Sequence, residues 1–590
     1  MDKKILKFLQ KEIALATLIL AGFLFLVPFA KALSLHSSFF DLGIFESLLH
    51  RIASTSEWQS AFSGHAHWFA LPFGWLYGLP PPSLAPYFLV SMQAILLLLP
   101  ALWFYRRFGV FSAFVYVAYY PVWVNAHFDF HFDHLAVPLL LGFYWALLDR
   151  RIGWAVLSAT LLIFLKEPFA LQTAACGVLL LWVAVHRKSI WEQPSDLVSQ
   201  RSLLLGAVWL IGVGLGYLVL VTHYLIPYFS IDGWHGSLES GAFGWLGSSF
   251  GEMILTIVTR PHVIIWDIIT TPSKLIYLVM IFGLIAFISL LRPAFLIPTI
   301  PLLAIAMLSR LSNYYDYNTH YTAGLIVPVM FAFMYGLPRA ERIWERLVLR
   351  IKGMLQYLRD FPAFTSLLAS CRGERCVFVR EGDKREGLFG RSGIGFSTVE
   401  ARRRLFYVLL FGWILFGHIM MSPSPTSRLF WSDKVWSYSW RAYVPTGREA
   451  MMKAAMLEHI PVDREVSVTT QNAVNWSHLA HRKVYLPFPL GIAEPHKVMD
   501  WSNRTWNGLG VFVRTEYKPL TITHDRYADY VVLDLKRPYF LIDRGCGWIY
   551  GECWDKEMEK KFLGWVSYTR SLYETVFERD GFMILRRGGV

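Results

Sequence analysis

One carboxylate stands among aromatic residues directly after the first long apolar segment of this chain. It is Asp41, in the stretch HSSFFDLGIFESLLHRI that covers residues 36–52. Apolar side chains at 45, 48, 49 and 52 have the spacing of an amphipathic helix, which we expect to lie on the outer membrane surface with its apolar face down. Asp41 could cap this helix. Alternatively, it could act as a general base whose proton affinity is raised by the neighbouring phenylalanines.

Histidine and aspartate alternate in a second segment, NAHFDFHFDHLAVP, residues 125–138. Positions 127, 129, 131 and 133 would share one face of an extended chain. Since imidazole and carboxylate groups together bind divalent cations, Asp129 and His131 are predicted metal ligands. The alternative is that these residues only solvate the end of a helix.

An adjacent pair of opposite charges, Lys166 and Glu167 in FLKEPF, lies at the predicted outer end of a span. Ionisable groups at this depth are candidates for function, so Glu167 is a second candidate catalytic carboxylate. The alternative is a local ion pair that marks the membrane boundary.

Several cationic or polar residues lie in segments predicted to be on the same side of the membrane as Asp41. A lipid phosphate needs a cation, and arginine can grip it through two hydrogen bonds. The residues predicted to bind substrate phosphate are Lys166, Arg260, Arg310, His320 and His67.

The composition predicts that these residues belong to a polytopic membrane protein. The chain has 590 residues, of which 55% are apolar and 17% charged, whereas soluble domains carry about a quarter charged residues. The net charge of +13 is attributed to cytoplasmic loops rather than to nucleic-acid binding. Apolar runs near the span length of roughly 20 residues predict about eleven transmembrane helices, at 13–30, 84–104, 109–126, 134–148, 152–165, 168–185, 203–222, 274–291, 293–308, 322–337 and 405–421.

Four regions follow from this pattern, in a fold that is mainly α. Residues 1–337 form a transmembrane core with a cytoplasmic N-terminus and a long first external loop at 31–83. Residues 338–404 are a basic cytoplasmic insert, and 405–421 form the last transmembrane helix. Residues 422–590 contain strand-like segments such as REVSVTT and YVVLDL, which predict a small external α/β domain.

The cysteines divide by predicted compartment. Cys546 and Cys553 lie in the external region, where a disulfide can persist, and are predicted to be joined. Cys371 and Cys376 fall in the cytoplasmic insert and should stay reduced, and Cys176 is predicted to be a core residue within a span.

Several segments together resemble an uncharacterised family of bacterial integral membrane proteins related to the GT-C glycosyltransferases. They are FFDLGIFESLL, HWFALPFGWLYGL, DFHFDHLAVPLLLGFYWALL, LKEPFAL, HYTAGLIVP and IPVDREVSVTTQNAVNWSHLAHRKVYLPFP, spread over most of the chain outside 338–404. The resemblance implies a GT-C-like architecture with Asp41 in the catalytic position of the first external loop. It also implies transfer of a sugar from a polyprenyl phosphate to an acceptor on the outer face.

The predicted function is therefore that of a glycosyltransferase of the bacterial inner membrane. Asp41 would deprotonate an acceptor hydroxyl, which attacks the anomeric carbon with inversion. The predicted partners are membrane lipid, a polyprenyl-phosphate sugar donor and an acceptor whose identity stays open, with a divalent cation as the candidate cofactor and no nucleic acid. The alternatives are a transporter or flippase, and a non-catalytic assembly protein that docks a partner through its C-terminal domain.

Overall fold

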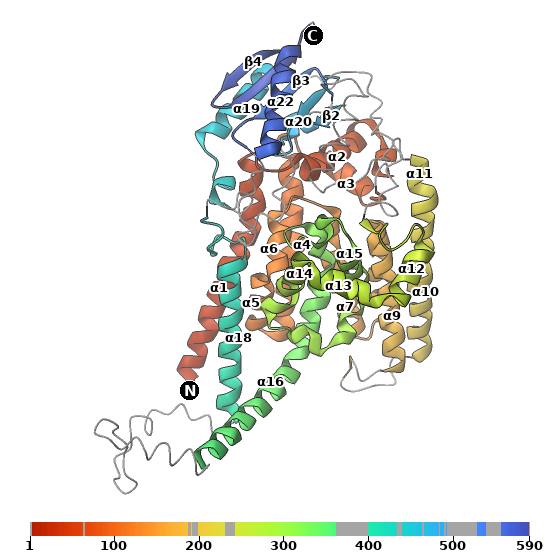
Figure 1. Ribbon diagram of the computed structural model, residues 1–590, viewed down its shortest axis with the longest axis vertical. Coiled ribbons are helices and arrows are strands. Elements are labelled where there is room, and N and C mark those ends of the chain that lie inside the picture. Colours follow the sequence, from red (N-terminus) through yellow and green to blue (C-terminus); the bar gives the residue numbers. More distant parts are fainter. Residues whose placement is uncertain are drawn as a thin grey trace, which may run out of the picture.

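The computed structural model of the chain (Figure 1) describes most of its residues. These are 3–62, 65–186, 190–191, 199–229, 242–360, 399–432, 439–462, 465–482, 484–488, 491–492, 528–537 and 556–588. Long helices form a bundle, and a small domain that ends in the C-terminus sits at one end of it, opposite the N-terminus.

Within the described ranges, six helical segments are long and apolar enough to cross a membrane. The chain is therefore a multi-pass membrane protein. The six segments lie in α1 (Lys3–Leu33), α4 (Ala85–Phe108), α9 (Glu167–Val185), the run of α10 (Gln200–Leu220), η6 (Val221–Leu225) and α11 (Ile226–Phe229), α16 (Ala323–Asp360) and α18 (Val399–Met421).

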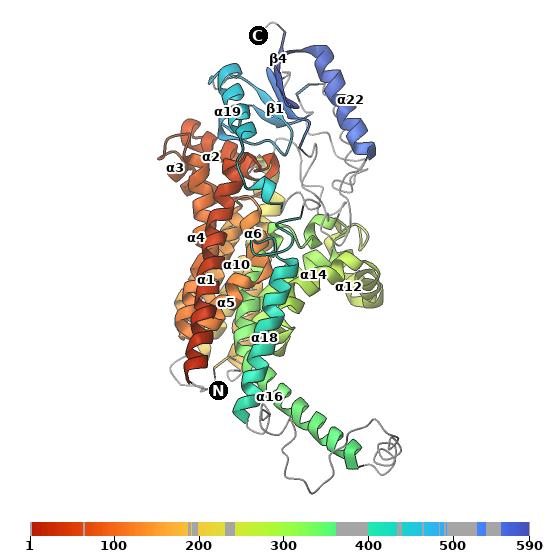
Figure 2. The same cartoon turned by 90° about the vertical axis from the view of Figure 1, so that its left-hand side faces the viewer.

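A further pair of helices passes the same test only if both are counted as one span. Helices α12 (Phe250–Thr259) and α13 (Pro261–Thr270) meet at an angle of 84°. Figure 2 shows α12 standing out from the side of the bundle.

The predicted count of eleven spans is not confirmed, because the other predicted spans coincide with shorter or broken helices. Proline lacks a backbone N–H and interrupts a helix, and Pro121, Pro293 and Pro301 each stand in the first turn of a new helix. The pieces are α5 (Val110–Ala118), α6 (Tyr120–His127), η3 (Phe132–Leu135), α7 (Ala136–Leu148), α8 (Ile152–Thr160), η4 (Leu161–Phe164), α14 (Pro272–Phe282), η9 (Gly283–Ile285), η10 (Ile288–Leu291), η11 (Pro293–Thr299) and α15 (Ile300–Leu308).

The loop after α1 folds into short helices between the bundle and the C-terminal domain: η1 (Phe39–Gly43), α2 (Ile44–Thr55), η2 (Trp58–Phe62) and α3 (Ala70–Tyr77). The predicted amphipathic helix exists as α2, but its placement on the membrane surface was wrong. Phe45, Leu48 and Leu49 are buried in a protein core that includes Phe62 and Phe130, because α3 and the bundle cover the apolar face of the helix.

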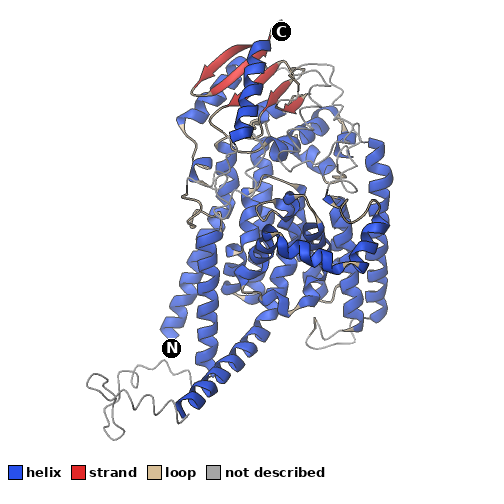
Figure 3. Cartoon of the chain, in the orientation of Figure 1, coloured by secondary structure: helices blue, strands red, loops and turns tan. Residues whose placement is uncertain are grey.

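The C-terminal domain, residues 439–588, is the predicted small α/β domain, and its strands gather at one end of the molecule (Figure 3). Its five strands are ordered β2-β1-β3-β5-β4, with β1 parallel to β2 and β3, and β5 antiparallel to β3 and β4. The elements are η15 (Trp440–Ala442), α19 (Gly447–His459), β1 (Val468–Thr470), α20 (Ser477–Ala480), β2 (Tyr485–Pro487), β3 (Tyr530–Asp534), α22 (Lys556–Leu572), β4 (Tyr573–Arg579) and β5 (Phe582–Arg587).

Alternating side chains of the central strands pack on two sides of this sheet, as the period of a strand requires. Val532 and Ile584 lie with Met452 of α19, whereas Val531 and Leu585 lie with Phe562 of α22. Both faces of the sheet are therefore covered by helices.

The C-terminal domain is fastened to the end of α1 by polar contacts. The buried guanidinium of Arg537 donates to the carbonyl oxygens of Ser34 and Leu35. The Lys453 ammonium donates to the Leu33 carbonyl at 2.8 Å, and the Phe39 amide donates to the Asn472 carbonyl at 2.8 Å. These contacts join the chain just before Asp41 to the C-terminal domain.

The predicted boundary at residue 338 falls inside α16, which runs to Asp360. Residues 361–398 lie outside the described residues, and so do Cys371, Cys376 and the predicted Cys546–Cys553 disulfide. Cys176 is buried within α9, as predicted.

Candidate functional site

Asp41 lies in the single turn η1, with only 6% of its surface exposed. Its Oδ2 accepts a hydrogen bond from the Ser38 hydroxyl, and its Oδ1 lies 2.8 Å from Nε2 of His131. Neither η1 nor α2 has a side-chain hydrogen bond at its N-cap. The capping role is therefore not what the geometry shows, and the carboxylate points toward the histidine instead.

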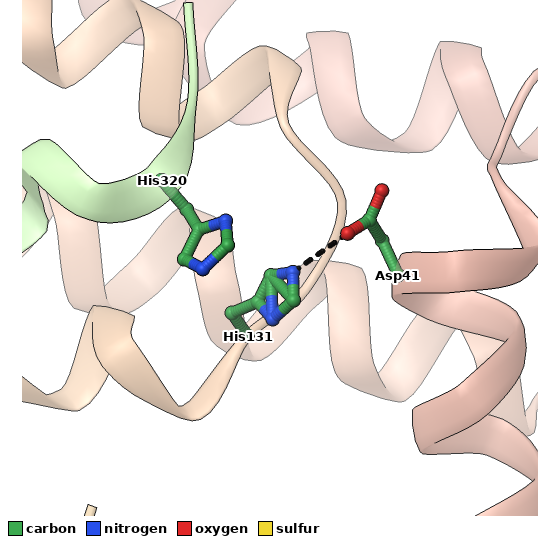
Figure 4. A group of neighbouring side chains, drawn as sticks. All are labelled: Asp41, His131 and His320. Atoms are coloured by element: carbon green, nitrogen blue, oxygen red, sulfur yellow. Dashed lines mark hydrogen bonds and ion pairs between the residues drawn. The ribbon is translucent and has the colours of Figure 1, made fainter. Parts of the chain in front are cut away.

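His131 and His320 complete a group of three buried side chains with Asp41 (Figure 4). His131 ends the extended segment between α6 and η3, and His320 begins η13 (His320–Thr322), which leads into α16. The two imidazole rings stack with their centroids 3.7 Å apart. One ligand-type atom from each of the three residues lies within 4.8 Å of the others.

Burial sets the protonation of this group. Desolvation, reinforced by the nearby Asp129 carboxylate, raises the pKa of Asp41 to about 7. Desolvation together with the neighbouring His320 lowers the pKa of His131 well below its usual value. His131 is therefore neutral at pH 7. Its Nε2 can donate a hydrogen bond to the Asp41 carboxylate or accept one from the protonated acid, depending on the tautomer.

Asp129, the predicted metal ligand beside His131, is turned to other partners. Its Oδ1 forms an ion pair with the Lys31 ammonium at 2.9 Å, and its Oδ2 accepts from the Ser38 amide at 2.6 Å. Lys31 was not singled out from the sequence. Lys31 ends the first apolar span, in VPFAKAL. An ionisable residue at that depth is a candidate for function, and this feature of the sequence could have identified it.

Glu167 begins α9 and holds the first loop in place. Its Oε1 accepts from the Ala66 amide at 2.7 Å, and its Oε2 lies 3.0 Å from Nδ1 of His65. His67 is buried, and its Nδ1 lies 2.9 Å from the Leu165 carbonyl oxygen. Burial lowers the pKa of His67 to about 3, so it is a neutral ring at pH 7.

The Lys166 ammonium is buried and lies 5.4 Å from the centroid of the Tyr321 ring. Among the described residues it forms no ion pair. The Lys166 charge lowers the pKa of Asp41. Lys166 is thus a buried cation that forms no ion pair with the described residues. It lies beside Tyr321, which follows His320 in the chain, and Nε2 of His320 lies 3.6 Å from Asp133.

Two predicted phosphate ligands are not brought into this group. Arg260 is exposed at the bend between α12 and α13. Arg310 is also exposed, and its guanidinium lies 4.9 Å from the centroid of the Trp245 ring.

Comparison with known families gives a match over residues 31–365 to the family described as "Predicted membrane protein (DUF2079)". The chain belongs to this family. The predicted membership of a family of polytopic membrane proteins is thereby confirmed. No curated protein matches the sequence.

Among solved structures, ArnT from Cupriavidus metallidurans in the apo state matches 94% of this chain and 95% of its own length, with 14% identity and a TM-score of 0.40. The DUF2079 match is the more informative of the two for the site. It includes Asp41, His131, Lys166, Glu167 and His320, and it ends before the C-terminal domain. The site therefore belongs to the part of the chain that defines the family.

Proposed function

We propose that this chain is an integral membrane glycosyltransferase that moves a sugar from a polyprenyl-phosphate donor to an acceptor. The observation that carries the proposal is the position of the Asp41 carboxylate. It is buried at the end of an apolar helix bundle, is held by Ser38 and His131, and has the buried Lys166 ammonium nearby. The apolar chain of a lipid carrier can pack against the helix bundle, and its phosphate can bind the Lys166 ammonium.

In this reaction Asp41 accepts the proton of an acceptor hydroxyl. The hydroxyl oxygen forms the new bond to the anomeric carbon from the face opposite the phosphate. The bond from that carbon to the phosphate oxygen breaks, and its electron pair leaves with the phosphate, so the configuration is inverted. His131 is a positioning residue, since its ring fixes the orientation of the Asp41 carboxylate.

Lys166 is the residue we assign to the departing phosphate, because an ammonium that no described ion pair occupies stabilises negative charge that develops beside it. Glu167 acts through others in this scheme: it holds Ala66 and His65 in the loop that covers the site. His67 and His320 line the same region as neutral rings or hydrogen-bonding groups. Arg260 and Arg310 stay outside the scheme, because both are exposed and neither belongs to the group around Asp41.

We further propose that the site faces outward from the bacterial inner membrane. Arg106 and Arg107 lie in the last turn of α4, at the end of the bundle away from the C-terminal domain (Figure 1). Helix α16 extends past that same end, and it carries exposed arginines such as Arg346. Basic residues favour the cytoplasmic side, which supports an external C-terminal domain and an external site.

The position of the site also bears on the transporter alternative. Transporters place ionisable binding groups near the middle of the membrane, on interrupted helices. Here Lys166 and Glu167 stand at the very start of α9, and His320 directly precedes α16. A site at the ends of helices suits a reaction at the membrane surface better than passage through the bilayer.

The test is Asp41→Asn, assayed for sugar transfer from synthetic polyprenyl-phosphate sugars by the full-length protein. Loss of a positioned general base should lower kcat by about 10²–10⁴-fold and leave donor binding and thermal stability near wild type. Glu46→Gln is the matched control, because Glu46 is an equally buried carboxylate five residues away that faces Asn475 of the C-terminal domain. An Asp41→Asn protein that turns over like wild type, while Glu167→Gln is inactive, would overturn the assignment.

A further inference from the structure

We infer that Asp41, His131 and His320 form a binding site for a divalent transition-metal cation, with Zn²⁺ the best match. The inference concerns the resting protein and does not depend on the transfer reaction. Within the described part of the chain, these three residues are the group of histidine, cysteine and acidic side chains whose ligand atoms come close enough to share one ion.

The distances suit a small ion. The three ligand atoms lie within 4.8 Å of one another, and the closest pair, Oδ1 of Asp41 and Nε2 of His131, is 2.8 Å apart. Zinc bonds of about 2.0–2.2 Å would place tetrahedral ligand atoms roughly 3.3–3.6 Å apart. Side-chain movements that shorten the longest of these separations by roughly 1.2–1.5 Å would therefore admit the ion.

His320 supplies an independent observation. The residue is 5% exposed, and neither of its ring nitrogens has a hydrogen-bond partner. Leaving a buried polar group unsatisfied costs about 1–3 kcal/mol, so an imidazole in this position needs a compensating ligand. A metal ion bound to one nitrogen satisfies it. The ring now stacks face to face on His131, so it must rotate to turn that nitrogen toward the ion.

The surroundings resemble those of an oriented metal ligand. Oδ2 of Asp133 lies 3.6 Å from Nε2 of His320, and a carboxylate that accepts a hydrogen bond from the second ring nitrogen orients a metal-bound histidine. Asp133 would thus fix the ring and leave Nδ1 for the ion. Ser38 similarly holds Oδ2 of Asp41 and leaves Oδ1 for ligation.

The ligand set decides which ion is bound. Two imidazoles and one carboxylate suit Zn²⁺ and related first-row ions, whereas Mg²⁺ and Ca²⁺ prefer oxygen ligands. The negative charges of Asp41, Asp133 and Glu167 offset the positive charge of Lys166, which would otherwise oppose a cation. Three protein ligands leave at least one position open, as in zinc sites that act on a substrate. Ligation through Oδ1 also leaves Oδ2 of Asp41 able to accept a proton.

The experiment measures Zn²⁺ binding by the full-length protein in detergent, purified with a tag that lacks histidine and stripped with a chelator. Equilibrium dialysis against Zn²⁺ followed by elemental analysis should give one ion per chain. His131→Gln and His320→Gln should each weaken binding by more than about 100-fold, and Asp133→Asn by about 10–100-fold, the usual effect of losing an orienting partner. His67→Gln is the matched control, as a buried histidine of the same region, and should bind like wild type.

Wild-type protein that holds no more Zn²⁺ than His320→Gln, or a His67→Gln variant that loses the ion equally, would overturn the site. X-ray absorption of the zinc-loaded wild type keeps the test decisive if the variants do not fold. Two imidazoles with oxygen ligands support the inference, and a sulfur shell or a shell without imidazole contradicts it. The two proposals fail separately, because the Zn²⁺ experiment contains no sugar donor. If no Zn²⁺ binds, Asp41 still acts as a base without a metal. If Asp41→Asn is active in sugar transfer, the measured Zn²⁺ binding still stands.

Discussion

The buried charges grouped around Asp534 in the C-terminal domain are paired, whereas two buried polar groups at the end of the helix bundle, Lys166 and His320, are not. In the domain, Asp534 accepts two hydrogen bonds from Arg448 at 2.7 Å each and a third contact from Arg537 at 3.1 Å. Glu449 lies 3.2 Å from the same Arg537 guanidinium and caps its own helix through Thr446. Each charge there has a partner of opposite sign.

At the bundle end, the Lys166 ammonium faces an aromatic ring, and both nitrogens of His320 lack a hydrogen bond. Both regions are buried, so exposure does not explain the difference. When every buried polar group has a partner, the folded state loses no stability to unpaired groups. A buried group without a partner lowers the stability of the fold. Such a group is retained where a ligand supplies the missing partner. The comparison is therefore the physical reason to look for the site at the bundle end.

The largest stability effect should come from breaking the paired region at Arg537. Removing one partner of a buried ion pair costs about 3–5 kcal/mol, so Arg537→Met should markedly lower the unfolding temperature of the detergent-solubilised protein. Arg570→Met is the control, because its pair with Glu578 is 40% exposed on each side and is worth less than about 1 kcal/mol. Equal losses in the two variants would contradict the distinction.

A pH-dependent effect is expected at Glu46, where the first loop meets the C-terminal domain. Burial raises the pKa of Glu46 from 4.5 to about 8. The unfolded chain releases this proton near pH 4.5 and the folded chain keeps it, so stability falls as pH rises to about 8, by at most about 1.4 kcal/mol per unit. Above pH 8 this contribution levels off.

Glu46→Gln removes that titration and should therefore gain stability over wild type as pH increases from 5 to 8, measured as the difference in unfolding temperature. Glu574→Gln, an exposed carboxylate of β4, should show no such trend. A Glu46→Gln difference that stays constant with pH would mean that the carboxylate is ionised in the folded protein.

The smallest effect is expected at His320. Replacing an unsatisfied buried imidazole by an apolar side chain of similar size removes a desolvation cost. His320→Leu in metal-free buffer should therefore leave the unfolding temperature unchanged or raise stability by up to about 1 kcal/mol. A loss as large as that of Arg537→Met would show that His320 is a structural residue.

The sequence predicted the long helices well where their apolar runs are uninterrupted, as in α9 and α10. Where prolines divide an apolar run, as at Pro121 and Pro293, hydropathy does not show that the helix stops and restarts. The α/β character of the C-terminal domain was visible in its short β-branched segments. The order of its strands was not, because pairing depends on contacts between distant segments.

Asp41, His131 and His320 were each selected from the sequence, but for three different roles. Their convergence could not be predicted, because 90 residues separate Asp41 from His131 and no local rule sets how η1 meets the segment after α6. The alternation of polar residues likewise suggested that Asp129 and His131 share a face. In the structure Asp129 turns to Lys31, a partner that lies outside that segment.

The contact between Arg537 and Ser34 has a consequence for biosynthesis. The two residues are 503 positions apart, and at about 5–20 residues per second the ribosome needs roughly 25–100 s to travel between them. During that interval the segment with Asp41 has already left the ribosome but lacks the domain that covers it. Its phenylalanines and Glu46 are then open to lipid, water or a membrane chaperone. The C-terminal domain can therefore close over the site only at a late stage of synthesis and folding.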